Sequence, residues 1–271
     1  MTASPATRFH ALHAVDAAGP LLLANAWDAG SARLAQAAGA RAIATSSAAV
    51  AWSHGWPDGG ALPVELLLQT TRAIAAAVEL PLSVDIEGGY ADEPARVGAL
   101  VGALVEAGAV GINIEDGAGD PALLCDKIAA ARAAASARGV DLFINARCDV
   151  FLRGLAEPAQ RVAGTLERAA RYRAAGASGL FAPGVVDAAD IAALVAGAGM
   201  PLNVMAWTGL PQLAQLRALG VRRLSAGSAI AEALHGLTLV LMRDFLATGR
   251  VEPRAAPAAS YRELQALMAR A

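Results

Sequence analysis

The sequence predicts a (β/α)₈ barrel, an α/β fold of the TIM type in which eight parallel strands alternate with helices. Eight short strand-like segments occur within about 250 residues, which is the strand count and length of that barrel. Longer Ala-, Leu-, Arg- and Glu-rich segments with helical spacing separate them. The first strand runs into NAWDAGSA and not into a GxGxxG loop, which disfavours the main alternative, a doubly wound open sheet.

The strand segments are short, apolar and rich in β-branched residues. We expect them at 20–25, 41–45, 81–87, 110–115, 141–147, 178–182, 201–205 and 221–225. Helices are expected at 63–79, 92–107, 121–138, 156–175 and 187–197. Several strands follow a Gly-containing helix stop, as in EAGAVGINI and AAGASGLF. Residues 1–250 are therefore predicted to form one barrel domain.

The last 21 residues, 251–271, are predicted to form a tail. Its Pro/Ala-rich start, VEPRAAPAAS, leads to an amphipathic pattern near 260–270. One helix of this length cannot enclose a core of its own. We expect it to pack on the barrel or on a neighbouring subunit.

Composition restricts the class of partner. The 271 residues are 56% hydrophobic and 17% charged, with a net charge of −2 and a pI near 6.1, which argues against nucleic-acid and membrane surfaces. No charge-free apolar stretch reaches the roughly 18 residues of a spanning helix, and no signal peptide is recognisable. The two cysteines exclude a disulfide scaffold. A cytoplasmic protein is expected.

Polar residues recur at the ends of consecutive predicted strands. Side chains at positions i and i+2 of a strand share a face, and catalytic groups of such barrels come from the carboxyl ends of strands. The pairs are Asp85 with Glu87, Asn113 with Glu115, and Asn145 with Arg147, and Asn203 lies on the seventh strand. Structural salt bridges or helix caps are the alternative reading, which the repetition on consecutive strands makes less favourable.

Several carboxylates beside one arginine favour a bound cation, because like charges in one mouth repel. The oxygen-only set, with no paired His or Cys, suits Mg²⁺ or Mn²⁺ better than Zn²⁺. Arg147 would then offer its planar guanidinium to a substrate carboxylate. Trp27, just past the first strand, has two equal interpretations, as a wall of the pocket or as core packing.

Four segments make the sequence resemble the isocitrate lyase/phosphoenolpyruvate mutase superfamily. They are VDIEGGY, GINIEDG, INARCDVFL and NAWDAGSARLAQAAGARAIATSSAAVAWSHGWPDG, and the similarity runs from about residue 20 to 248. The NAWDAGSA opening looks more like the phosphoenolpyruvate mutase branch than like isocitrate lyases. The resemblance implies a barrel whose last helix is exchanged between subunits, in a homodimer or homotetramer.

The resemblance also implies roles for individual residues. Asp85 looks like the direct metal ligand, and Glu87 stands where many members have Asp. Glu115 and Asp58 look like holders of metal-bound water. Ser46 and Ser47 would receive the substrate carboxylate or enolate oxygen with backbone N–H groups and a hydroxyl, and Arg147 matches the arginine that grips the substrate.

The proton-transfer part of the family pattern is missing. Lyases of the superfamily carry a Lys-Lys-Cys-Gly-His loop after the fourth strand, and this stretch reads GAGDPALLCDK. Cys125 is expected to pack as a small hydrophobe, and Lys127 to make a surface contact. Pro183 and Gly184 replace a lyase glutamate. Water or His54 is left as the general acid.

The expected function is that of a Mg²⁺-dependent lyase, with Mn²⁺ possible, that forms or cleaves a C–C bond next to an α-oxocarboxylate through an enolate. The substrate would be a small α-oxo acid or a dicarboxylic acid. Two alternatives stay open. One is a P–C bond mutase or hydrolase of the phosphonopyruvate type, and the other is a barrel that binds 2-oxo acids with little turnover.

Overall fold

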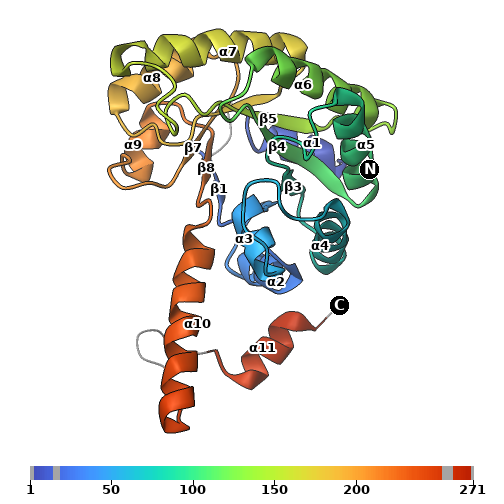
Figure 1. The fold of residues 1–271 in the computed structure, drawn as a ribbon, viewed down its shortest axis with the longest axis vertical. Coiled ribbons are helices and arrows are strands. Elements are labelled where there is room, and N and C mark those ends of the chain that lie inside the picture. Colours follow the sequence, from blue (N-terminus) through green and yellow to red (C-terminus); the bar gives the residue numbers. More distant parts are fainter. Residues whose placement is uncertain (1–2, 15–18, 252–258, 270–271) are drawn as a thin grey trace.

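The computed structural model describes residues 3–14, 19–251 and 259–269. Eight parallel strands form one sheet in the order β1-β8-β7-β6-β5-β4-β3-β2, which confirms the predicted (β/α)₈ fold (Figure 1). Every strand overlaps its predicted segment. The strands are β1 (Leu21–Leu23), β2 (Ile43–Ala44), β3 (Leu82–Asp85), β4 (Ala109–Glu115), β5 (Phe143–Arg147), β6 (Gly179–Phe181), β7 (Leu202–Met205) and β8 (Arg223–Ser225).

The helices follow the strands in turn. They are α1 (Pro5–Ala11), α2 (Ala29–Ala37), α3 (Ser47–Ser53), α4 (Val64–Ala77), α5 (Pro94–Glu106), α6 (Pro121–Ser136), the 3₁₀ turn η1 (Pro158–Gln160), α7 (Arg161–Ala175), α8 (Ala188–Gly197), α9 (Leu213–Ala218), α10 (Ala229–Thr248) and α11 (Tyr261–Met268). Polar caps fix several of their starts: the carboxylate of Asp28 accepts from Ser31 N–H, and Asp120 and Asp187 cap α6 and α8 in the same way.

The strand ring closes between β1 and β2 through a single bridge, Ala26 with Thr45. Asn25 strengthens this closure: its Nδ2 donates to the Thr45 carbonyl at 2.9 Å, and its Oδ1 accepts from Gly227 N–H at 3.0 Å. The residue adopts φ 53°, a left-handed conformation that asparagine tolerates. One side chain thus ties together the carboxyl ends of β1, β2 and β8 at the barrel mouth.

The end of the barrel opposite the mouth, at the amino ends of the strands, is apolar, and α1 covers it. Phe9 of α1 is fully buried and meets the Phe143 ring edge-on, with 5.5 Å between ring centroids. Above this plug the barrel interior becomes polar. The side chains of Asn113, Asn145 and Asn203 are buried there and hydrogen-bond to one another through Asn145 Nδ2, at 2.9 and 3.0 Å. The barrel floor is therefore a plug of aromatic rings beneath a layer of amides.

A charged residue lies between the plug and the amide layer. Arg223 of β8 is almost fully buried, and its Nη2 donates to Asn113 Oδ1 at 3.0 Å. Its guanidinium carbon lies 5.9 Å from the centroid of the Phe9 ring, a cation–π distance. Burial lowers the pKa of Arg223 to about 9.

His13 gives the fold a testable pH dependence. Its ring stacks on Phe143, its Nδ1 bonds to the Phe9 carbonyl at 2.8 Å, and burial, aided by the charge of Arg223, lowers its pKa from 6.5 to about 3. The unfolded chain therefore binds this proton more tightly than the folded chain. As pH falls from 6.5 toward 3, His13 should lower the free energy of unfolding by up to about 1.4 kcal/mol per pH unit.

The His13→Asn variant, which does not titrate there, isolates this effect. Urea unfolding at a series of pH values between 7 and 4 should show that the wild type loses stability relative to the variant as pH falls. Parallel curves for the two proteins would contradict the assignment.

The helix α10 leaves the barrel instead of lying along it (Figure 1). Among its twenty residues only Ala231 is buried, and large apolar side chains are exposed along it: Ile230, Leu234, Leu239, Val240, Met242, Phe245 and Leu246. The predicted final helix is α11, which lies against α2 of its own chain, where Arg33 donates to the carbonyls of Leu267 and Ala269 at 2.8 and 2.5 Å. The predicted Pro/Ala-rich stretch before it falls largely outside the described residues. Within the described part of the chain, no helix combines the length and apolarity needed to cross a membrane.

Candidate functional site

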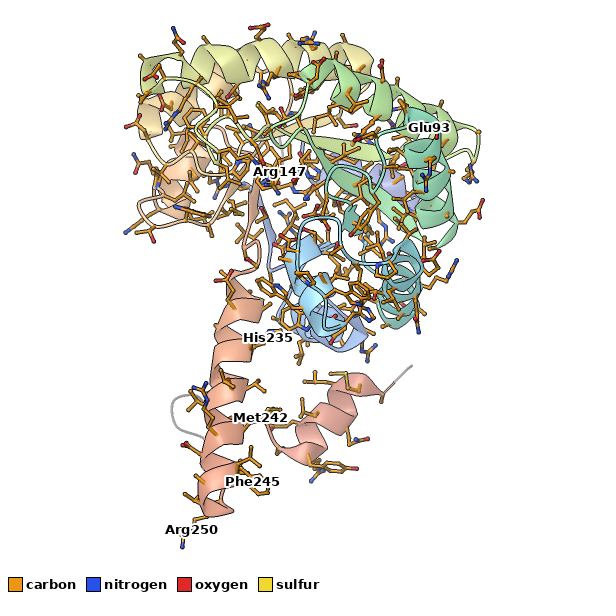
Figure 2. The ribbon with its side chains drawn as sticks, viewed as in Figure 1. Glu93, Arg147, His235, Met242, Phe245 and Arg250 are labelled. Atoms are coloured by element: carbon orange, nitrogen blue, oxygen red, sulfur yellow. The ribbon has the colours of Figure 1, made fainter. Side chains whose placement is uncertain are left out.

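The candidate site lies at the carboxyl ends of β3, β4 and β5, where parallel register brings the predicted polar pairs together. Asp85 is level with Asn113, which is level with Asn145, and one step further Glu115 is level with Arg147. Asn113 and Asn145 belong to the amide layer above the aromatic plug, and Glu115 and Arg147 lie two residues further along their strands, toward the mouth. Figure 2 labels Arg147 toward the middle of the barrel domain.

Asp85 and Glu87 are the two buried residues among the predicted metal ligands. The backbone N–H of Asp85 donates to Thr45 Oγ1 at 2.8 Å, and its Oδ1 accepts from Glu87 N–H at 3.2 Å. The N–H of Ser47, the first residue of α3, also stabilises the Asp85 carboxylate. Burial nevertheless raises the pKa of Asp85, against the opposing charge of Arg147. The positive charge near the Asp85 carboxylate therefore does not offset the cost of burying it.

Glu87 and Tyr90 occupy a tight turn after β3. Both have left-handed backbone conformations, at φ 50° and 56°, which cost energy for residues with large side chains. Tyr90 donates its hydroxyl to Glu87 Oε1 at 3.0 Å. Burial raises the pKa of Glu87, and the nearby charge of Asp58, on the exposed 55–60 loop, raises it further. The turn thus holds a second carboxylate close to Asp85.

Arg147 is gripped from two sides. Its Nη1 lies 2.5 Å from Glu115 Oε2, and its Nε and Nη2 bind the two oxygens of Asp149 at 2.6 and 3.0 Å. Burial alone would lower the pKa of Arg147, but the two carboxylates outweigh it and raise the pKa. Burial raises the pKa of Glu115 to about 8 although Arg147 opposes the shift. The guanidinium is locked in one orientation.

A second layer of bonds holds Asp149 in place. Its side chain is 0% exposed, and its backbone N–H donates to Asp116 Oδ1 at 3.0 Å. The other oxygen of Asp116 accepts from Tyr172 Oη at 2.5 Å and from Arg168 Nη1 at 2.6 Å, both on α7. Helix α7 therefore anchors the loop after β5 and, through Asp149, the orientation of Arg147.

The mouth carries more negative than positive charge. Five carboxylates (Asp58, Asp85, Glu87, Glu115 and Asp149) face two guanidinium groups, Arg147 and Arg153. A cavity of about 440 Å³ opens here, and Glu87, Glu115 and Arg153 are among its lining residues. An excess of carboxylate oxygens of this kind fits a hard divalent cation.

The metal set is not fully assembled. Within the described residues, no three His, Cys, Asp or Glu side chains converge closely enough to hold an ion directly. Magnesium keeps several waters and usually binds one or two carboxylates, so Asp85 with one neighbour fits it, and the other acids would hold its waters. The roles in metal binding stay predictions: direct coordination for Asp85, a place beside it for Glu87, and contact with metal-bound water for Asp58 and Glu115.

Ser46 and Ser47 lie at the start of α3, and their part in binding the substrate carboxylate stays a prediction. Ser46 is the N-cap of α3 and its backbone N–H donates to the Ala26 carbonyl at 3.3 Å. Asn203 lies in the amide layer, where its Nδ2 donates to Val204 O and Ser225 Oγ, and its part in substrate binding stays a prediction. Trp27 is half-buried against the core beside the mouth.

The contacts of His54 and Lys127 bear on two other interpretations of the sequence. His54 Nε2 bonds to Thr70 Oγ1 of α4 at 2.8 Å, so one of its two ring nitrogens is engaged. The expectation of a surface contact for Lys127 is wrong. Its side chain is buried on α6, and its Nζ donates to the Gly88 carbonyl at 2.8 Å and to Asp92 at 3.4 Å, which secures the loop after β3.

Sequence reasoning missed Asp149, Arg153, Tyr90 and Arg223. Asp149 could have been predicted, because it continues the i, i+2 series of Asn145 and Arg147. Arg153 follows Asp149 by four residues, but in a loop where such spacing has no fixed meaning. Arg223 lies next to Arg222, and the sequence does not indicate which of the two points into the barrel.

The chain matches the family model described as phosphoenolpyruvate phosphomutase over residues 9–246. Among curated relatives, an uncharacterised protein of Mycobacterium tuberculosis is 37% identical over 268 residues, covering 95% of both chains. The 2-methylisocitrate lyase of Escherichia coli is 32% identical over 198 residues, covering 69% of this chain and 64% of the lyase.

Solved structures agree with these matches. A Burkholderia cenocepacia protein described as a candidate phosphonomutase is 41% identical, with a TM-score of 0.82 over 88% of this chain and 99% of its own. A phosphonopyruvate hydrolase, solved with oxalate and Mg²⁺, is 26% identical, with a TM-score of 0.83 over 98% of this chain and 95% of its own.

Proposed function

The chain belongs to the phosphoenolpyruvate phosphomutase family, within the isocitrate lyase/phosphoenolpyruvate mutase superfamily, and we propose that it is a Mg²⁺-dependent carbon–carbon lyase. It would form or cleave a C–C bond next to an α-oxocarboxylate. The observation that carries this proposal is the mouth itself, where Asp85 and the Glu115–Arg147 pair stand beside the start of α3.

The chain's own residues would divide the work as follows. The hydroxyl groups of Ser46 and Ser47 and the guanidinium of Arg147 would receive the substrate carboxylate and the oxygen on which negative charge develops, since the backbone N–H groups of the two serines already donate to the Ala26 carbonyl and the Asp85 carboxylate. Asp85 would hold Mg²⁺ directly, and Glu87, Glu115 and Asp58 would orient its waters. When bound, Mg²⁺ would polarise the α-oxo oxygen and stabilise the enolate charge.

Contacts around the β4–α6 loop favour C–C over P–C chemistry. The lysine nearest that loop, Lys127, is committed to Gly88 O and Asp92, and so is not available to grip a phosphonate. The loop itself is short, from Asp116 to Asp120. A P–C bond mutase or hydrolase stays the second candidate, because a candidate phosphonomutase and a phosphonopyruvate hydrolase are both similar to this chain.

The first test is thermal stability with oxalate and a panel of 2-oxo and 2-hydroxy dicarboxylic acids, each with and without Mg²⁺. A ligand at about one hundred times its dissociation constant should stabilise the protein by about 2.7 kcal/mol, and only when the metal is present. Acids that stabilise the protein are then incubated with it, and the 2-oxo acid product is quantified.

The outcomes separate the candidates. Release of a 2-oxo acid from a 2-hydroxy dicarboxylate supports the lyase, whereas phosphate release or isomerisation of phosphonopyruvate supports the P–C enzyme. Binding with no turnover of any acid supports the binding barrel. An absence of Mg²⁺-dependent stabilisation by every acid would contradict the proposed site.

We also propose that the protein is a homo-oligomer in which α10 packs on a neighbouring subunit. A groove of about 490 Å³ runs over β1 and β8, with Leu22 46% exposed on its strand, so the barrel surface here lacks a covering helix. Helix α10 presents exposed apolar side chains, including Met242 and Phe245, that need such a surface (Figure 2).

Replacing Leu22 in the groove with Glu should dissociate the oligomer, and Leu239→Glu on α10 should do the same. Leu213→Glu, which alters a similarly exposed leucine on α9 outside the groove, serves as the control. Light scattering after size-exclusion chromatography measures the mass. A monomeric wild type, or an oligomer that persists in both variants, would contradict the packing of α10 on a neighbouring subunit.

A further inference from the structure

The turn that follows β3 holds two residues in backbone conformations that their side chains disfavour. Glu87 and Tyr90 are left-handed, at φ 50° and 56°, and such residues persist only where the surrounding structure fixes them. Part of this support comes from the backbone. Gly89 N–H donates to the Ile86 carbonyl at 2.8 Å, and Glu115 N–H of β4 donates to the Glu87 carbonyl at 2.9 Å. These two bonds leave the middle of the turn to be held by another element.

Lys127 of α6 supplies that support. Its side chain is 8% exposed, and its Nζ donates to the Gly88 carbonyl at 2.8 Å. Within the described residues, no other hydrogen bond to this carbonyl is found. Asp92, the acid that lies 3.4 Å from Nζ, is 95% exposed, so water screens the ion pair. Because a buried charge needs a partner, the ammonium depends on the Gly88 carbonyl.

This bond connects the predicted metal site to a helix that carries none of the predicted ligands. Lys127, Gly88 and Glu87 line the same cavity of about 440 Å³. Tyr90, which donates to Glu87 Oε1 at 3.0 Å, belongs to the same turn, so the acid and its hydrogen-bond donor would move together if the turn relaxed. Groups that orient metal ligands commonly change metal affinity by about ten- to a hundredfold when they are replaced.

We propose that Lys127 is a positioning residue of the metal site, whose bond to the Gly88 carbonyl holds the turn after β3 in the conformation that presents Glu87 beside Asp85. The inference rests on the proposed function, in which both acids serve a bound Mg²⁺. A side chain that does not touch the cation would then set the affinity for it. A lysine that only stabilised the fold would change the free energy of unfolding and leave the Mg²⁺ affinity of the folded protein unchanged.

Lys127→Met tests this role, because methionine keeps an unbranched, flexible side chain and has no donor for the Gly88 carbonyl. Calorimetry with Mg²⁺ in the presence of oxalate should show that the variant binds the metal at least about tenfold more weakly than the wild type. Hydrogen exchange followed by mass spectrometry should be faster in peptides that cover residues 86–91, where Gly89 N–H closes the turn. Lys127→Arg, which can still donate, should bind Mg²⁺ within about threefold of the wild type.

Arg132→Met is the matched control for a loss of stability. Arg132 also lies on α6 and donates to backbone carbonyls, those of Leu142 and Gly176 at 2.6 and 2.8 Å, which precede β5 and β6 at the other end of the barrel. Its replacement should lower the free energy of unfolding and leave Mg²⁺ affinity unchanged. Asp92→Asn removes the exposed ion pair and keeps the Gly88 bond, so it should stay within about twofold of the wild-type affinity.

The outcomes separate the role of Lys127 from the proposed function. Wild-type Mg²⁺ affinity in Lys127→Met would overturn the role and leave the proposed function intact. An equal loss of Mg²⁺ affinity in Arg132→Met would do the same, because the effect would then follow global stability. A wild type that binds no Mg²⁺ in the presence of oxalate would overturn both. If Lys127→Met does not fold, the milder Lys127→Gln should lose Mg²⁺ affinity in the same direction, and its binding as tightly as the wild type would overturn the role.

Discussion

Replacing Asp85 with Asn should lower kcat/KM by at least about a thousandfold while leaving the fold intact. Asn keeps the size of the side chain and can still accept the N–H of Glu87, but it lacks the charge that a divalent cation requires. Oxalate should also lose its Mg²⁺-dependent stabilisation of the protein. Turnover, calorimetry with Mg²⁺ and chemical unfolding measure the three quantities.

The stability of this variant distinguishes a functional acid from a structural one. Because burial raises the pKa of Asp85, its charged form is disfavoured in the folded state at neutral pH. Asp85→Asn should therefore leave the free energy of unfolding unchanged or raise it at pH 7 without metal. The difference should shrink as pH falls toward the ordinary range of an aspartate, where the folded wild type binds the proton that its raised pKa favours.

Asp141→Asn provides the control, because Asp141 is an exposed acid that contacts His10 and Arg132 away from the mouth. It should change neither Mg²⁺ binding nor turnover. If Asp85→Asn instead unfolded the protein, the carboxylate would be a structural ion-pair partner and the metal assignment would be wrong.

The strands and their polar ends could be predicted because they repeat. Each strand is a short apolar segment bounded by a helix stop, and alternation along β4 and β5 places Glu115 and Arg147 on one face. Parallel register then fixes them side by side. Alternation identifies the face on which a side chain lies but not its partners, so the hydrogen bonds that join Asn145 to Asn113 and Asn203 could not be predicted from the sequence.

Loops and alanine-rich helices carried no comparable signal. The buried face of α6 cannot be recognised in PALLCDKIAAARAAAS, where alanine occurs on every side, and so the burial of Lys127 was missed. Arg153 reaches Asp149 through a loop with no period, and only coordinates show that both Arg147 and Arg153 use the same carboxylate. Most of the residues proposed to bind metal and substrate lie at strand ends, whereas Asp149 and Arg153 come from an irregular segment.

Replacing Arg147 with Lys should lower kcat/KM by about a hundredfold or more, although the charge is retained. A lysine is a point charge and cannot hold Glu115 on one side and both oxygens of Asp149 on the other. Without that grip, the cation at the substrate position is no longer fixed in one orientation. Arg138→Lys, which alters a surface pair with Glu106, should change activity little.

Removing the charge, in Arg147→Met, should also lower the free energy of unfolding by about 3–5 kcal/mol, because two enclosed carboxylates lose their partner. Among the residues that the structure describes, Asp149 would keep Arg153 as its ion-pair partner, and Glu115 would lose the one it has. A second change, Glu115→Gln, should then recover part of the lost stability in the Arg147→Met background but not in the wild type. Urea unfolding of the four proteins measures this coupling between Glu115 and Arg147. If the effects of the two changes on the free energy of unfolding were additive, Glu115 and Arg147 would not stabilise the fold by their interaction. Asp149 alone would then hold Arg147.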